Sequence, residues 1–322
     1  MRFAVETWSP EYGAPAEDAA LAAASPDVDL AVEAAPADWG PRRPAPGTVA
    51  PAVICFVDGV RRVDARVWVT PDDGVPRQGI CASFGAGVVR CDGAAELREL
   101  AVGRGLFCPV ADAEAIVTGH GRYRPHPVAS EDPDALSLAL QGGMADLEHR
   151  VSEAAGARAG GDCDLLVLDG PLRQRHRLPG AVGYVKTHQR SYLPEAVVGV
   201  VAALGDGERT PVFLIGGRWS RWSWYLRLPG ERAHGWSGVV RCEASLEVAA
   251  TAVPALADRV TAALPRFASA AHKDARAPQN LYPIAGLERE LRHRLGDPLL
   301  LLRALRKSAA GAVAAPATVP VP

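Results

Sequence analysis

The chain has 322 residues, of which 48% are hydrophobic and 22% are charged, so it is long enough to bury a substantial core. Lysine and arginine number 35 against 37 aspartate and glutamate, which excludes a protein that binds nucleic acid through a basic overall charge. No stretch approaches the roughly 20 uncharged apolar residues of a membrane-spanning helix, and the first residues lack the pattern of a signal peptide, so we expect a cytoplasmic protein without membrane contact.

The two ends of the chain lack the pattern of a packed core. Residues 1–50 are rich in alanine and proline, without a sustained apolar period, and predict an extended N-terminal arm. Residues 307–322 are mainly alanine, proline and valine and predict a disordered tail. Residues 51–306 are therefore expected to form a single α/β domain.

This region opens with strands. Residues 52–57 form a continuous apolar run, typical of a strand buried on both faces, and the run ends in Asp58. Alternation over 63–69 and a strand-like stretch over 78–90 predict that antiparallel strands follow.

Helices and strands then alternate. Apolar residues at steps of three and four predict an amphipathic helix over 134–157, and residues 165–168 repeat the buried-strand pattern before Asp169. The remaining expected elements are a helix over 194–204, strands over 211–215, 222–228 and 238–244, and helices over 245–264 and 284–306. Together they predict a mixed sheet flanked by helices.

The six cysteines are scattered along the chain. There is no CxxC pair, and four of the six lie inside apolar runs. We therefore expect small core residues, with neither a zinc site nor a disulfide framework.

Asp58 and Asp169 are the first candidates for chemistry, because each follows a buried run and ligands of α/β sheets collect beyond strand ends. Carboxylates suit Mg²⁺ and Mn²⁺, and two such ions roughly 3.5 to 4 Å apart activate water for phosphodiester hydrolysis. The alternative is structural, since Asp-Gly is also a common turn pair after a strand.

Two further residues fit the same site. Glu148 lies on the flank of the helical apolar stripe, where it either leans towards the sheet or is solvated. Lys186 either neutralises a phosphate or is an ordinary surface lysine.

A segment rich in arginine and tryptophan suggests contacts with DNA. Arg218, Arg221 and Trp222 offer cations and a stacking face to a single strand. The alternation around Trp222 fits equally well a strand whose tryptophans pack in a core or a dimer interface.

Several of these segments, in this order, resemble the NurA nuclease family. The similar segments are Val57-Asp58-Gly59, Leu168-Asp169-Gly170-Pro171-Leu172, Gly183-Tyr184-Val185-Lys186-Thr187 and Gln279-Asn280-Leu281-Tyr282-Pro283-Ile284. Glu148 falls on the helix that carries the glutamate of that family.

The resemblance implies an RNase H-like fold and a DNA nuclease that favours Mn²⁺, or uses Mg²⁺, as a pair of ions held by Asp58, Glu148 and Asp169. It places Lys186 and Tyr282 near the scissile phosphate. It also implies cleavage of single strands and DNA ends, a homodimer, and a HerA-type hexameric ATPase as partner in DNA end processing or defence against phage.

One position departs from the family pattern. The family has a histidine ligand eight residues after the tyrosine of its Tyr-Pro pair, and that count from Tyr282 gives Glu290. The apolar stripe of the last helix favours Glu288 instead, and His293 is a third alternative. A NurA-like docking subunit without a working metal site therefore stays open. An actin-like ATPase is disfavoured, because neither Asp-Gly pair continues into a glycine-rich phosphate loop.

Overall fold

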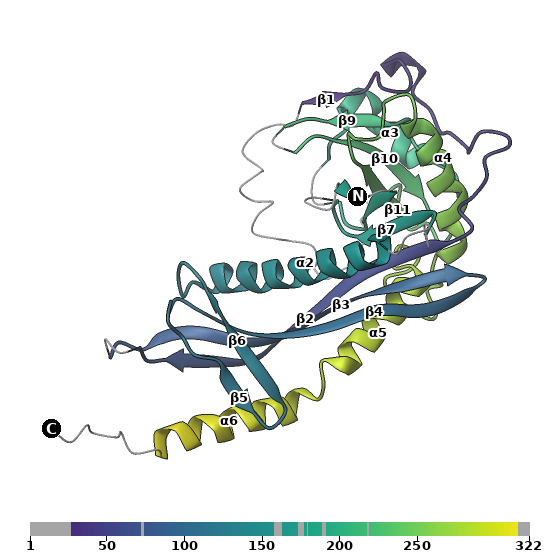
Figure 1. Ribbon diagram of the computed structural model, residues 1–322. Helices are drawn as coiled ribbons and strands as arrows, with labels where there is room; N and C mark the ends of the chain where they lie inside the picture. Colours follow the sequence, from purple (N-terminus) through teal and green to yellow (C-terminus); the bar gives the residue numbers. More distant parts are fainter. Residues whose placement is uncertain are drawn as a thin grey trace. The chain divides into compact units, whose positions relative to one another are not determined.

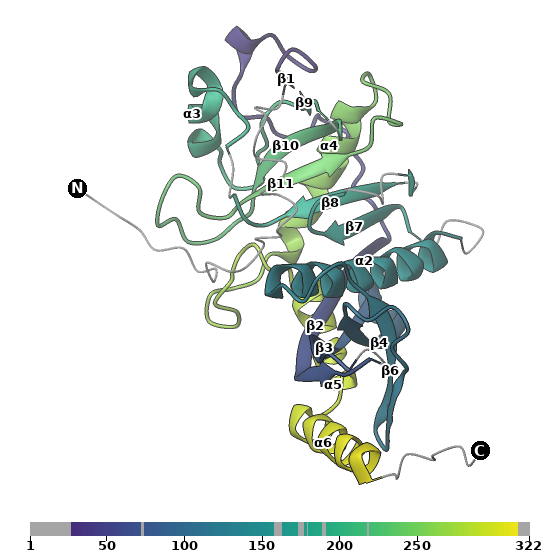
Figure 2. The same cartoon turned by 90° about the vertical axis from the view of Figure 1, so that its left-hand side faces the viewer.

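The computed structural model describes residues 27–71, 74–157, 163–172, 177–178, 180–188, 191–217 and 219–314. Within them the strands form a mixed sheet in the order β1-β9-β10-β11-β8-β7-β2-β3-β4-β6-β5, with helices flanking it (Figures 1 and 2). The expected mixed α/β architecture is thus confirmed. None of the described helices has both the length and the apolar character needed to cross a membrane.

The chain divides into two compact units. The first comprises residues 1–58, 88–99 and 152–287, and the second comprises residues 59–87, 100–151 and 288–322. Five elements contribute to both units: β2 (Ile54–Val69), β3 (Arg77–Asp92), β4 (Ala94–Cys108), α2 (Pro133–Ala157) and α5 (Tyr282–Arg294).

The first unit is built on a mixed set of strands. Its own strands are β1 (Val28–Asp29), β7 (Leu165–Asp169), β8 (Ala181–Val185), β9 (Phe213–Ile215), β10 (Arg221–Arg227) and β11 (Val239–Ala244). The start of β2, β7 and β8 run parallel, and β11, β10, β9 and β1 continue the sheet in antiparallel pairs. The helical elements of the unit are η1 (Pro36–Asp38), α3 (Glu195–Ala203), α4 (Val253–Ala263) and η3 (Leu264–Phe267).

One face of this part of the sheet forms the main core. Because strand residues alternate between faces, β2, β7 and β8 each contribute two apolar side chains to it. These are Ile54, Phe56, Leu165, Val167, Val182 and Tyr184, and all are at most 1% exposed. Buried residues of α4 and the first turn of α5 cover them, and α4 lies against β10 (Figure 2).

The opposite face holds a second cluster beneath α3. Val197 and Val201 of α3 pack with Phe213, Tyr225 and Val239 of the sheet. Both faces of this part of the sheet therefore carry buried apolar residues, in keeping with the continuous apolar runs of β7 and of the start of β2.

Part of the predicted N-terminal arm belongs to the fold, contrary to expectation. Residues Val28–Asp29 pair with β9, and Trp39 packs against Phe213 with ring centroids 5.9 Å apart. Glu33 accepts two hydrogen bonds from the buried guanidinium of Arg209, at 2.8 and 2.9 Å. The burial of Arg209 requires this counter-charge, so residues 27–50 are tied to the sheet. Residues 1–26 lie outside the described part.

The second unit contains the outer strands and the last helix. Its own elements are β5 (Ile116–Thr118), β6 (Gly121–Pro127) and α6 (Pro298–Ala314), and α6 runs beside β5 (Figure 1). Buried Asp64 accepts hydrogen bonds from Ser83 at 2.5 Å and from Tyr123 at 3.0 Å. This polar cluster lies beside an apolar cluster of β3, β4 and α6.

Three predicted element boundaries were wrong. β2 is one strand from Ile54 to Val69, so Asp58 lies within a strand and does not begin a turn. The helix predicted over 245–264 begins at Val253. The helix predicted over 284–306 is two helices, because Gly296 adopts a φ of 83° before Pro298.

The predicted disordered tail does not begin at residue 307, since α6 continues to Ala314; residues 315–322 lie outside the described part. The cysteine prediction was also wrong at one pair, because Cys55 and Cys163 form a disulfide. The other four cysteines are buried, as predicted.

Candidate metal centre

The main core face of the first unit ends in charged residues. Asp58 follows Ile54 and Phe56 on the same face of β2, and Asp169 follows Leu165 and Val167 on β7. The parallel ladder pairs Val57 with Leu168, so the two aspartates are the next residues of neighbouring strands. The sequence predicted their proximity correctly, although Asp58 does not end its strand.

Lys186 brings a positive charge to the same place. It follows β8 directly, is only 3% exposed, and donates hydrogen bonds to Asp169 at 2.5 Å and to the side-chain oxygen of Asn280 at 2.8 Å. The interpretation of Lys186 as an ordinary surface residue is therefore wrong. Its ammonium group lies between a carboxylate and an amide oxygen, where it offsets the charge of Asp169.

Asn280 is a member of this cluster that the sequence reasoning did not single out. It is fully buried, and its amide nitrogen donates to Asp274 at 2.7 Å. Burial raises the pKa of Asp274, but hydrogen bonds from Asn280 and from the backbone and side chain of Arg276 outweigh this effect and leave the pKa below its ordinary value. Asp274 therefore stays ionised and fixes the orientation of the Asn280 amide.

The segment before α5 is anchored to the sheet by two further contacts. Tyr184 donates its hydroxyl hydrogen to the carbonyl of Gln279 at 2.7 Å, and the Gln279 amide donates to the carbonyl of Lys186 at 3.3 Å. The sequence offered one indication of Asn280, which is a polar residue in the segment Gln279-Asn280-Leu281. An amide that is buried in such a segment needs hydrogen-bond partners.

Glu288 joins the aspartates in the structure. It is 7% exposed and lies on the buried stripe of α5, four residues after Ile284 and three before Leu291. Asp58, Asp169 and Glu288 each offer a carboxylate oxygen, and these oxygens lie within 4.8 Å of one another. Three buried carboxylates at this spacing suit a hard divalent cation, which takes oxygen ligands and offsets their mutual repulsion.

No protein family matches this chain. Neither a family model nor a curated protein shows significant similarity to its sequence.

The other two candidates for the ligand on α5 are Glu290, which is bonded to another side chain, and His293, which is exposed. Glu290 accepts a hydrogen bond from Arg294 at 2.7 Å on the outer side of α5, and His293 is exposed. Of the three alternatives, Glu288 is the one grouped with the aspartates.

Glu148 does not belong to this group. A side-chain oxygen of Glu148 lies against Gly59, where an added Cβ would collide with it, and Glu148 also interacts electrostatically with Arg61. Gly59 follows Asp58 in β2, so the two residues face opposite sides of the strand. Glu148 thus leans towards the sheet, as one interpretation predicted. It approaches the face of β2 opposite to the one on which the Asp58 side chain lies.

Tyr282 begins α5 and is 41% exposed. Its hydroxyl oxygen accepts a hydrogen bond from the backbone of Ala270 at 3.2 Å, and the ammonium of Lys273 lies 5.4 Å from its ring centroid. These contacts hold an exposed aromatic ring two residues after Asn280.

Two of the residues predicted to contact DNA make contacts within the protein. Arg221 donates to the fully buried carboxylate of Glu243 at 2.8 Å, on the face of the sheet opposite to that of the main core. Trp222 packs against the main core and donates to the carbonyl of Val248 at 2.8 Å. These positions favour the packing interpretation of the tryptophan segment. Arg218 lies outside the described residues.

Proposed function

We propose that this chain is a divalent-metal-dependent nuclease that hydrolyses phosphodiester bonds. The observation that carries the proposal is the group of three buried carboxylates, Asp58, Asp169 and Glu288, with oxygens within 4.8 Å of one another. Carboxylates at such distances repel one another, and a divalent cation between them would offset this repulsion.

These three residues would hold Mn²⁺ or Mg²⁺ at the site. When bound, a divalent ion supplies Lewis-acid stabilisation of a phosphoryl oxygen and lowers the pKa of a coordinated water. Lys186 keeps Asp169 in place through their ion pair, and Asn280 holds the ammonium group from its other side. The exposed ring of Tyr282 is the residue we propose for contact with the substrate.

The choice of DNA as substrate rests on the resemblance to the NurA family. With it come the proposals of an RNase H-like core, a pair of ions, cleavage of single strands and DNA ends, a homodimer, and a HerA-type hexameric ATPase partner in end processing or phage defence. The near-neutral charge of the chain supports a partnership, because a nuclease without a basic surface needs other cations to hold the phosphate backbone.

A second candidate function is a catalytically inactive docking subunit of such an ATPase complex. Two observations favour it: Glu290 stands at the position where the family pattern has a histidine, and the charge of Asp169 is already offset by Lys186.

Cleavage assays distinguish the two candidates. Single-stranded and blunt duplex DNA are incubated with the wild type, Asp58→Asn and Asp169→Asn in Mn²⁺, in Mg²⁺ and in EDTA, with Glu290→Gln as a matched control on the exposed side of α5. The nuclease proposal requires metal-dependent cleavage that both aspartate variants lose and the control keeps. A wild type that stays inactive with a HerA-type ATPase and ATP present contradicts it and supports the docking subunit.

A further inference from the structure

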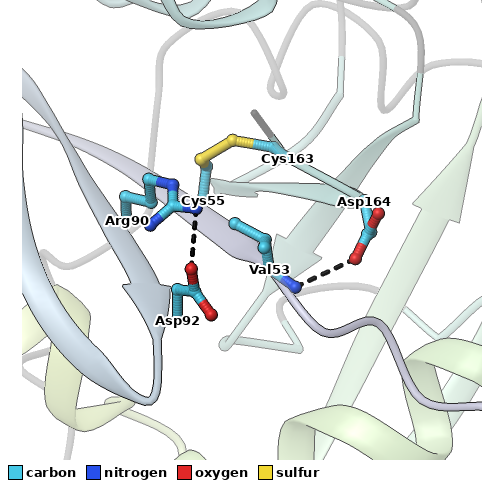
Figure 3. Close-up of a disulfide and its surroundings, with 6 residues drawn as sticks. All are labelled: Val53, Cys55, Arg90, Asp92, Cys163 and Asp164. Atoms are coloured by element: carbon cyan, nitrogen blue, oxygen red, sulfur yellow. Dashed lines mark hydrogen bonds and ion pairs between the residues drawn. A yellow bond between two sulfur atoms is a disulfide. The ribbon is translucent and has the colours of Figure 1, made fainter. Parts of the chain in front are cut away.

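The disulfide between Cys55 and Cys163 joins two segments that are 108 residues apart in the sequence. Cys55 lies in β2, and Cys163 precedes β7, so the bond links the beginnings of two neighbouring parallel strands (Figure 3). The two Cα atoms are 5.8 Å apart, which is a normal separation for a disulfide.

The two cysteines differ in burial. Cys55 is 2% exposed, whereas Cys163 is only partly buried. A small cavity of about 20 Å³ reaches both residues and is lined by Arg90, Arg98 and Glu99, among others. An incoming thiol therefore meets the sulfur of Cys163 first.

Two guanidinium groups and one carboxylate, that of Glu99, line the cavity. Arg90 lies beside the disulfide and pairs with Asp92 at 2.9 Å (Figure 3), while Arg98 pairs with Glu96 at 2.6 Å. Guanidinium groups near a sulfur stabilise its thiolate form, which is the attacking and the leaving species in thiol–disulfide exchange.

The strands at the disulfide are also held without it. Asp164, the residue after Cys163, accepts hydrogen bonds from the backbone N–H groups of Ala52 and Val53 at 2.9 Å each. Its own N–H donates to the carbonyl of Val53 at 2.9 Å. Figure 3 shows the bond from the Val53 N–H to the Asp164 carboxylate. Because these three bonds and the β2–β7 ladder fix the same junction, the chain keeps its fold when the disulfide opens.

We propose that Cys55–Cys163 is a reversible thiol–disulfide exchange site that small thiols such as glutathione reduce in the folded protein, with Cys163 as the attacked sulfur. The attacking thiolate forms a mixed disulfide with Cys163, and Cys55 leaves as a thiolate and takes a proton from water. A second thiolate then attacks the thiol-derived sulfur of the mixed disulfide and releases Cys163. In total the protein disulfide gains two electrons and two protons, and two small thiols become one small disulfide.

Mass spectrometry of the native protein tests this proposal. The wild type is treated with reduced glutathione without denaturant and the exchange is stopped with acid. The free thiols are then alkylated with N-ethylmaleimide in denaturant and mapped by peptide. We expect both cysteines to become alkylated while the circular dichroism spectrum stays unchanged. In Cys55→Ser, oxidised glutathione should add to Cys163, whereas in Cys163→Ser the buried Cys55 should stay unmodified.

Charge variants test the role of the cavity. Arg90→Gln combined with Arg98→Gln should slow the exchange several-fold, while Arg232→Gln, which removes a similar exposed ion pair with Asp206, should leave the rate unchanged. A disulfide that glutathione opens only in denaturant, a glutathione adduct on Cys55, or equal rates in the charge variants would overturn the proposal. So would a wild type that carries both thiols free under oxidising conditions.

Discussion

Replacing Lys186 with methionine removes the positive charge of the site at nearly constant volume. Lys186 is 3% exposed, and its ammonium lies 2.5 Å from Asp169 and 2.8 Å from Asn280. Breaking a buried ion pair by removing one partner typically costs about 3–5 kcal/mol, because the remaining charge stays buried without compensation. We therefore expect Lys186→Met to lower the free energy of unfolding by about 3–5 kcal/mol in EDTA.

A divalent ion should restore much of this loss, because it replaces the ammonium as the counter-charge of Asp169. An ion present at 100 times its Kd adds about 2.7 kcal/mol to the stability of the folded state. Urea unfolding of the wild type and Lys186→Met, in EDTA and in Mn²⁺, measures both effects, and the exposed Lys273→Met serves as the control.

The double variant Asp169→Asn with Lys186→Met checks that the two charges act as a pair. It should be more stable than the sum of the single changes predicts, because both charges are removed together. A loss of unfolding free energy below about 1 kcal/mol for Lys186→Met would refute a stabilising ion pair between Lys186 and Asp169. Strictly additive effects of the two single changes would refute it as well.

Three further predictions concern other parts of the fold. Burial raises the pKa of Glu243, but the charges of Arg241 and Arg221 outweigh this effect and leave the pKa below its ordinary value. The stabilisation from Glu243 is therefore present above the unfolded pKa near 4.5 and is lost as the pH falls through the folded pKa. Urea unfolding at several pH values should show a steeper acid loss in the wild type than in Glu243→Gln. Gly59→Ala places a methyl group against Glu148 and should lower the free energy of unfolding by about 1–3 kcal/mol. Gly142→Ala in α2 adds a methyl group that meets no neighbour and should raise the free energy of unfolding by up to about 1 kcal/mol. Thermal unfolding that ranks the two variants in the opposite order would contradict this packing. Cys55→Ser opens a loop closed over 108 residues and should lower the stability by about 4–5 kcal/mol on the chain-entropy account, and calorimetry of the wild type in a reductant should give the same loss.

The buried strands were predictable because their apolar runs are continuous. The apolar run 165–168 predicted the bounds of β7 (Leu165–Asp169) to within one residue. A strand that is covered on both faces has few polar positions, so the ends of its apolar run mark the ends of the strand. Asp169 follows directly, so its place at the sheet edge could be inferred. β2 was harder to predict, because Asp58-Gly59 has the sequence of a turn, whereas in the structure it lies within a strand that has β7 and β3 as neighbours.

Contacts between distant segments were beyond the sequence pattern. Helical periodicity placed Glu148 on the flank of α2, but it does not state which face of a sheet the helix covers, and that face decides whether the carboxylate meets Asp58. The Cys55–Cys163 pair has no spacing signal, because the two residues meet only once β2 and β7 are neighbours. The link from Lys186 to Asn280 likewise joins residues 94 positions apart, and Asn280 is in turn bonded to Asp274, six positions before it.

The central claim is that Asp58, Asp169 and Glu288 form one divalent-cation site. Isothermal titration of the metal-free protein with Mn²⁺ tests it directly, with Asp58→Asn, Asp169→Asn and Glu288→Gln compared with Glu290→Gln. We expect saturable binding in the wild type and in Glu290→Gln, and binding weakened at least about tenfold, or about 1.4 kcal/mol, in each of the other three variants. Equal binding in all five proteins, or no binding to the wild type, would contradict it.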